Sequence, residues 1–242
     1  MIVPLIGSLS LRKKRDSYRL EAEIAHLVQF LKHYRKEIKP VDALEFLSTF
    51  AFMGTYSAQD VQTLEKHYRL RIPAGLPKTI TYLHRQFFDA ILPFAGKQFW
   101  GNQYTKTRGV LVERLALAAL KMYEGEKGDY SMILLENGES LGLTINAGHE
   151  ELDLVVYPEN QEMAIGECKA DGSRFHTEDK RARWYELAAE RIEHEGMKTV
   201  NIFAVCATNG DIMTKHLKSM ATTRRWWLFS ISEHKEPWKL DP

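Results

Sequence analysis

The chain has 242 residues, of which 44% are hydrophobic and 27% charged, a balance typical of a globular protein with one large core or a core and a smaller domain. Its net charge of +1 excludes the global basic field of a highly charged, nonspecific nucleic-acid binder. No apolar run is long enough for a membrane span or a signal peptide. The two cysteines, Cys168 and Cys206, are interpreted as buried free thiols of a cytoplasmic protein, although a disulfide between strands stays open.

Residues 1–100 are predicted to form a helical subdomain. Apolar residues recur at helical spacing over 17–37, and Pro40 ends this pattern. Three further helices are indicated, which begin near Asp42, Ser57 and Thr79. The pair over 42–70 has the proportions of a helix-turn-helix, although helical hairpins with a glycine are common elsewhere. We interpret this part as a recognition or dimerisation subdomain.

Residues 101–242 are predicted to form an α/β core. A Leu- and Ala-rich helix opens it, Asn137-Gly138 indicates a hairpin turn, and Gly196 is a plausible helix stop. The expected order is helix, three strands, helix, strand, helix, strand, over 110–123, 130–135, 151–157, 164–170, 177–196, 200–207, 211–220 and 227–231. A weak extra strand is expected over 141–145.

The most informative residues are charged side chains on two of these strands. Counting from the centre of the turn at 158–162, a symmetric hairpin sets Asp153 opposite Glu167. Lys169 lies two residues after Glu167 and therefore projects from the same face of the strand. Unpaired charge beside a core is costly, but a divalent cation would stabilise it. The alternative without a function is an exposed ion pair between Glu167 and Lys169 that contributes little to stability.

A magnesium ion suits this arrangement because it prefers oxygen ligands and keeps several waters. A bound metal lowers the pKa of such a water, which can then act as a nucleophile. Lys169 would stabilise the negative charge that gathers on an attacked phosphate. The main-chain carbonyl of Cys168 is a further candidate ligand. These are the parts that phosphodiester hydrolysis needs.

Asp153 followed by Glu167-Cys168-Lys169 resembles the signature of the PD-(D/E)xK nuclease superfamily, which includes many restriction endonucleases. The resemblance implies a restriction-endonuclease-like core over 101–242, with a central mixed sheet flanked by helices. It also implies that Glu113, on the preceding helix, assists at the metal site, although a solvated helical Glu beside Arg114 is an equal alternative. Leu152 stands where the family has proline.

The function implied by this resemblance is a Mg²⁺-dependent endonuclease of the Type II restriction kind, which cuts double-stranded DNA as a homodimer with one or two ions per site. One alternative is a defence or repair nuclease that acts on single-stranded DNA, branched DNA or RNA. Another is a catalytically silent nuclease fold that binds nucleic acid.

Several polar residues near the predicted site have two interpretations. Lys180, Arg181 and Arg183 at the start of the next helix, with Ser173 and Arg174 before them, are candidate DNA phosphate contacts or an ordinary solvated surface. Four other residues are candidate ligands or bases but are interpreted as solvated: His149, Glu150, Glu151 and His176. The basic run 12–15 is an arm on the DNA backbone or a solvated tail.

Overall fold

The computed structural model divides the chain into two compact units, Met1–Asp16 with Val112–Pro242, and Ser17–Leu111. Each unit is considered by itself. The described residues are 2–14, 21–33, 102–119, 128–141, 151–159, 161–177, 179–220, 224–231 and 238–240, with a few positions between 66 and 90.

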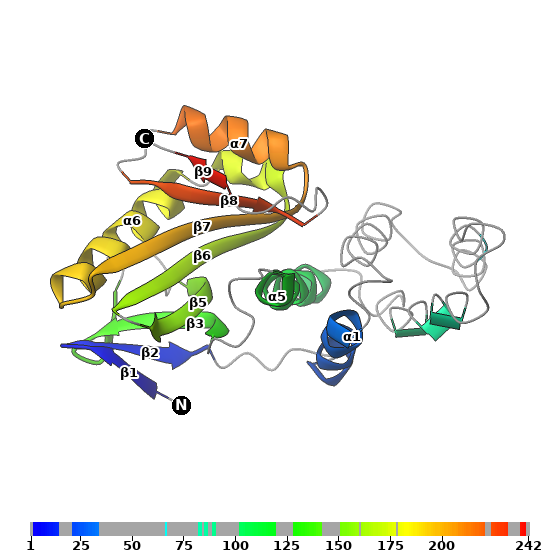
Figure 1. Ribbon diagram of the computed structural model, residues 1–242, viewed down its shortest axis with the longest axis horizontal. Helices are drawn as coiled ribbons and strands as arrows, with labels where there is room; N and C mark the ends of the chain where they lie inside the picture. The colour runs from blue at the N-terminus through cyan, green and yellow to red at the C-terminus, as the bar shows by residue number, and fades with distance from the viewer. Residues whose placement is uncertain are drawn as a thin grey trace. The chain divides into compact units, whose positions relative to one another are not determined.

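The first unit is built on a nine-stranded mixed sheet (Figure 1). Its order is β1-β2-β3-β5-β6-β7-β8-β9, and the short β4 pairs with β3. Neighbouring strands are antiparallel, except that β6, β7 and β8 are parallel to one another. The strands are β1 Ile2–Ile6, β2 Leu9–Lys13, β3 Gly128–Glu136, β4 Glu139–Ser140, β5 Glu151–Glu159, β6 Glu162–Asp171, β7 Thr199–Thr208, β8 Trp226–Ser230 and β9 Trp238–Leu240.

Two helices make the parallel connections of this sheet. The helix α6 (Asp179–His194) joins β6 to β7 after the short 3-10 helix η4 (Gly172–Thr177), and α7 (Gly210–Ser219) joins β7 to β8 (Figure 1). The helix α5 (Asn102–Ala119) precedes β3. The expected order of helix, three strands, helix, strand, helix and strand is therefore confirmed, and the α/β class with it. Beyond it, the described residues add β1, β2, the two-residue β4 and β9.

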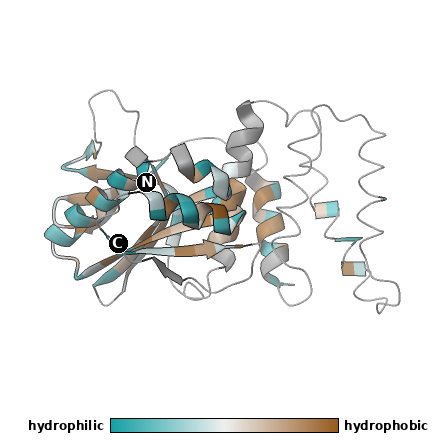
Figure 2. Cartoon of the chain, turned by 90° about the horizontal axis from the view of Figure 1, so that it is seen from above, coloured by the Kyte–Doolittle hydropathy of each residue, from teal (hydrophilic) through white to brown (hydrophobic). Residues whose placement is uncertain are grey.

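The helix α6 packs one face against the sheet. Trp184, Ala188 and Ile192 are fully buried on it, whereas Leu187 is 37% exposed, although its spacing from Trp184 and Ala188 is helical. Tyr185 is buried instead, because it lies four residues before Ala189 on the stripe that faces the strands. Figure 2 shows apolar residues dominating the strands, whereas the helices also carry hydrophilic ones.

The first residues of the chain do not belong to a helical subdomain. β1 and β2 form an antiparallel hairpin, and β2 continues the sheet through the pair Leu11↔Leu134. Leu9 and Leu11 are buried in the core, and Gly7 turns the hairpin with a φ of 54°. Alternating Leu residues after a glycine indicate such a hairpin, but the signal is short, and the strand that β2 pairs with begins only at Gly128.

In the second unit, the helix α1 (Glu21–His33) confirms the helix expected over 17–37, and it buries Ile24, Leu27 and Val28. The proposed helix-turn-helix over 42–70 lies outside the described residues, apart from helical Lys66. No helix within the described parts of the chain has the length and apolar character needed to cross a membrane. Cys168 and Cys206 are both buried, and neither is part of a disulfide, as expected.

Candidate metal centre

The charged residues of β5 and β6 come together where these two strands separate. Their ladder ends at the pair Leu154↔Gly166, which places Asp153 and Glu167 next to each other across the strands, as expected. Beyond this pair, the main-chain N–H of Cys168 donates to Oδ2 of Asp153, at 2.8 Å. A carboxylate thus takes the place of a main-chain acceptor at the end of the ladder.

A tyrosine from α6 bridges the same opening. The hydroxyl of Tyr185 donates to the carbonyl of Gly166, at 2.7 Å, and accepts from the main-chain N–H of Asp153, at 3.1 Å. Because this hydroxyl is bonded to both strands, it fixes how far apart they lie. The position of the Asp153 carboxylate therefore depends on the helix as well as on the hairpin.

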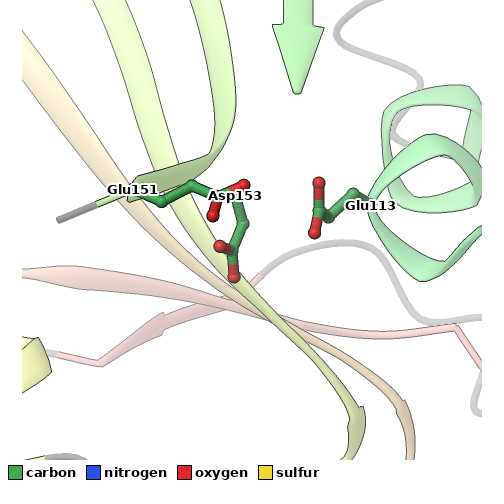
Figure 3. A group of neighbouring side chains, drawn as sticks. All are labelled: Glu113, Glu151 and Asp153. Atoms are coloured by element: carbon green, nitrogen blue, oxygen red, sulfur yellow. The ribbon is translucent and has the colours of Figure 1, made fainter. Parts of the chain in front are cut away.

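Three carboxylates gather on one side of this opening (Figure 3). One oxygen each from Glu113, Glu151 and Asp153 lies within 4.8 Å of the others. Glu113 comes from α5, and its Oε2 accepts a hydrogen bond of 2.7 Å from Oγ of Ser131. The structure therefore places Glu113 beside Asp153, as the sequence suggested. It also adds Glu151, which the sequence predicts as a solvated acid.

Glu167, across the strands from Asp153, is held by cations. Its Oε1 forms an ion pair with Lys169, and its Oε2 accepts a hydrogen bond of 2.8 Å from Nε of Arg181. The Nη2 of Arg181 lies 3.2 Å from Oδ1 of Asp153. The guanidinium of Arg181 thus joins the two carboxylates that the sequence predicts as metal ligands.

The pKa values of the acids differ according to these partners. Burial raises the pKa of Asp153 well above its ordinary value, and repulsion from Glu167 and Glu113 adds to the rise. Burial likewise raises the pKa of Glu113 to about 7, against the hydrogen bond from Ser131. Burial also acts to raise the pKa of Glu167, but the charges of Arg181 and Lys169 outweigh it and lower this pKa. Negative charge is thus poorly compensated at Glu113 and Asp153.

The N-terminal hairpin brings two lysines to this cluster. Nζ of Lys14 lies 2.6 Å from Oε2 of Glu151, and Nζ of Lys13 lies 2.6 Å from Oδ1 of Asp129 and over the ring of Tyr130. The basic run 12–15, for which the sequence leaves two interpretations, a DNA-binding arm or a solvated tail, therefore lies in part beside the acidic residues of the site. Sequence reasoning missed this, because nothing local links residues 13 and 14 to Glu151.

The remaining predicted contacts are distributed as follows. Arg174 and Arg183 are exposed, whereas Ser173 is half-buried and its N–H donates to Oδ1 of Asp171, at 2.9 Å. Arg181 is turned inward on the carboxylates and does not form part of an open surface. His149, Glu150 and the side chains of His176 and Lys180 lie outside the described residues.

The donor set of the cluster suits a hard divalent cation. Its three carboxylates are drawn from α5 and β5, which are separate parts of the chain, and oxygen ligands of this kind are those that Mg²⁺ and Ca²⁺ prefer. Two of these carboxylates are buried with raised pKa values, and a cation would relieve the repulsion that contributes to this rise. Cys168, whose main-chain carbonyl is a further candidate ligand, lies next to the cluster, because its N–H donates to Asp153.

Comparisons with known proteins add little to this picture. No protein-family model matches the chain, and no curated protein matches it. Among solved structures, the chain is similar to protein VC1899 from Vibrio cholerae, with a TM-score of 0.42 and 13% sequence identity. The likeness covers 94% of this chain and 56% of that one, so this chain spans little more than half of the other protein's length. A likeness this remote carries no argument about function.

Proposed function

We propose that the protein is a Mg²⁺-dependent endonuclease that hydrolyses phosphodiester bonds in double-stranded DNA, of the Type II restriction kind and with a restriction-endonuclease-like core. The observation that supports this most is the meeting of Asp153 with Glu167 and Lys169 where β5 and β6 separate, with Glu113 facing them from the preceding helix. The order of elements around this site agrees with the one that the resemblance implies.

Asp153, Glu113 and Glu151 would hold the ion, with Glu167 and the main-chain carbonyl of Cys168 as further candidates. When bound, the ion polarises the phosphate and lowers the pKa of a coordinated water. The ammonium of Lys169, fixed by Glu167, supplies positive charge where the attacked phosphate becomes more negative. Burial of the acids excludes bulk water and strengthens each of these interactions.

Substrate binding would need cations outside the cluster. The exposed Arg174 and Arg183 are the proposed contacts to DNA phosphates, with Lys180 and Ser173 next to them in the sequence. Because a single site cuts a single strand, we propose a homodimer that presents one site to each strand of the duplex. Cleavage of both strands at a symmetric sequence would then follow from the symmetry of the dimer.

The test is cleavage of linear and supercoiled duplex DNA with and without Mg²⁺. Asp153→Ala and Lys169→Ala are expected to abolish cleavage. Glu162→Ala and Lys198→Ala, which change exposed residues at the opposite end of β6 and before β7, should cut like the wild type. Discrete fragments that depend on Mg²⁺ and on Asp153 would support the proposal.

Two outcomes would redirect the proposal. If duplex DNA stays intact but single-stranded DNA, branched DNA or RNA is cut with the same mutational pattern, the protein is a defence or repair nuclease. If nothing is cut and calorimetry detects no Mg²⁺ binding that depends on Asp153, the fold is a silent binding module.

A further inference from the structure

We propose that the guanidinium of Arg181 takes the place of a second metal ion, so that the site binds a single divalent cation among Glu113, Glu151 and Asp153. This inference rests on the proposed function, because it concerns the metal of the same site. It decides between the one and two ions that the resemblance leaves open, and it changes the role expected of Arg181 from a DNA contact to a fixed internal cation.

The guanidinium of Arg181 binds three acceptors that could otherwise hold a second cation. Its Nε donates to Oε2 of Glu167, at 2.8 Å, and its Nη2 lies 3.2 Å from Oδ1 of Asp153 and also donates to the main-chain carbonyl of Glu151. Two carboxylates and a carbonyl that converge on one point are the ligands that a hard cation would take. A guanidinium already satisfies all three of these acceptors.

The second step is that Arg181 is held firmly in this position. Its guanidinium carbon lies 5.5 Å from the ring centre of Trp184 and 5.4 Å from that of Tyr185. Both rings are fully buried, and the hydroxyl of Tyr185 is bonded to both strands of the opening. A hydrated ion would have to break a buried, charge-assisted network to displace the guanidinium, and removing one partner of such a network is strongly unfavourable.

The third step is the balance of charge. The acids of the site are Glu113, Glu151, Asp153 and Glu167, and Lys14, Lys169 and Arg181 form ion pairs with three of them. With every group ionised, these side chains leave one net negative charge. A single divalent ion turns this into one positive charge, which matches the one negative charge of a phosphodiester. A second ion would bring the charge of these groups to three positive, more than one phosphodiester balances.

In this arrangement Glu167 is a positioning residue for Lys169 and Arg181, and Glu151 is a metal ligand. Glu167 forms ion pairs with Lys169 and Arg181 and is not one of the three grouped carboxylates, whereas Glu151 has an oxygen within 4.8 Å of the ligand oxygens of Glu113 and Asp153. The two acids are therefore expected to respond differently when each is changed to its amide.

The experiment is calorimetric titration of the full chain with Mg²⁺, and with Mn²⁺ as a second probe, without DNA. The wild type should bind one ion per chain. Arg181→Met, which keeps much of the side-chain volume but offers no charge, should bind two ions, and Arg181→Lys should bind one. Glu167→Gln changes a residue that positions the site and should weaken binding by about 10–100-fold, and Glu151→Gln, which removes a ligand charge, should weaken it more than that.

Each result decides something, and none depends on catalytic activity. Two ions in the wild type, or one ion in folded Arg181→Met, would overturn this inference and leave the proposed function intact. A larger loss of affinity in Glu167→Gln than in Glu151→Gln would also overturn it, and this comparison holds even if Arg181→Met does not fold. No ion in the wild type would overturn the proposed function as well.

Discussion

Replacing Glu113 by glutamine should stabilise the metal-free protein at high pH. This carboxyl is 8% exposed, and its pKa is raised from the ordinary 4.5 to about 7, chiefly by burial. A shift of that size corresponds to a cost of about 3 kcal/mol for the ionised side chain in the folded state. Glutamine has nearly the same shape and keeps an oxygen that can accept the hydrogen bond from Ser131.

The pH dependence follows from where the proton is bound. Between about pH 4.5 and pH 7 the folded protein holds the Glu113 proton more tightly than the unfolded chain does, so this group lowers stability as pH rises. The Glu113→Gln variant lacks this loss. We expect it to match the wild type at the low end of this range and to exceed it by up to about 3 kcal/mol at pH 8.

The measurement is urea unfolding in EDTA, followed by tryptophan fluorescence at intervals between pH 5 and pH 8. Glu190→Gln, on the exposed face of α6, is the matched control and should stay within about 0.5 kcal/mol of the wild type. Adding Mg²⁺ at about 100 times its Kd should raise the stability of the wild type by about 2.7 kcal/mol and that of Glu113→Gln by less. A variant that is no more stable than the wild type at pH 8, or whose advantage does not grow with pH, would refute the reasoning.

Three further predictions concern the site and the core. Tyr185→Phe should lower the free energy of unfolding by about 1–3 kcal/mol, because a buried N–H and a buried carbonyl lose their partner; an unchanged urea midpoint would contradict this. Leu11→Ala should cost about 2–5 kcal/mol. Ile2→Ala, at a residue that is 60% exposed, should cost less than about 0.5 kcal/mol, and equal losses would argue against the N-terminal hairpin as part of the core. The Kd for Mg²⁺ should fall as pH rises towards 7, because Glu113 must release its proton to bind the ion; a pH-independent Kd in calorimetry would count against Glu113 as a ligand.

Local patterns were sufficient for most of the elements of the core. The hairpin of β5 and β6 was predicted from two apolar runs and a polar turn, and its register sets Asp153 beside Glu167 as expected. The helix α7 was also predicted, over 211–220, but it begins at Gly210 and its N-cap residue is Asn209, which has a left-handed conformation. Such a difference of one or two residues at a helix end is decided by the loop before it, not by the helix pattern.

Partners that are distant in the sequence could not be predicted in the same way. Lys14 contacts Glu151, and Arg181 contacts Asp153, only because β2 adds to β3 and because α6 crosses the strands at the opening. For the same reason Arg181 was expected on an exposed helix face, and Glu151 was interpreted as solvated. Neither residue lies in a local sequence pattern that predicts a partly buried side chain paired with an opposite charge.

The sequence alone was enough to determine the α/β class, the order of elements from α5 to β8, and the placement of Glu167 and Lys169 on one strand face. These depend on periodicities of 2 and 3.6 residues, which a short stretch of chain carries by itself. Only the tertiary structure decided that Glu113 and Glu151 share a cluster with Asp153 while Arg181 neutralises Glu167. The physical reason is that the charge state of a buried acid depends on every group packed around it, and those groups come from β2, α5 and α6 at once.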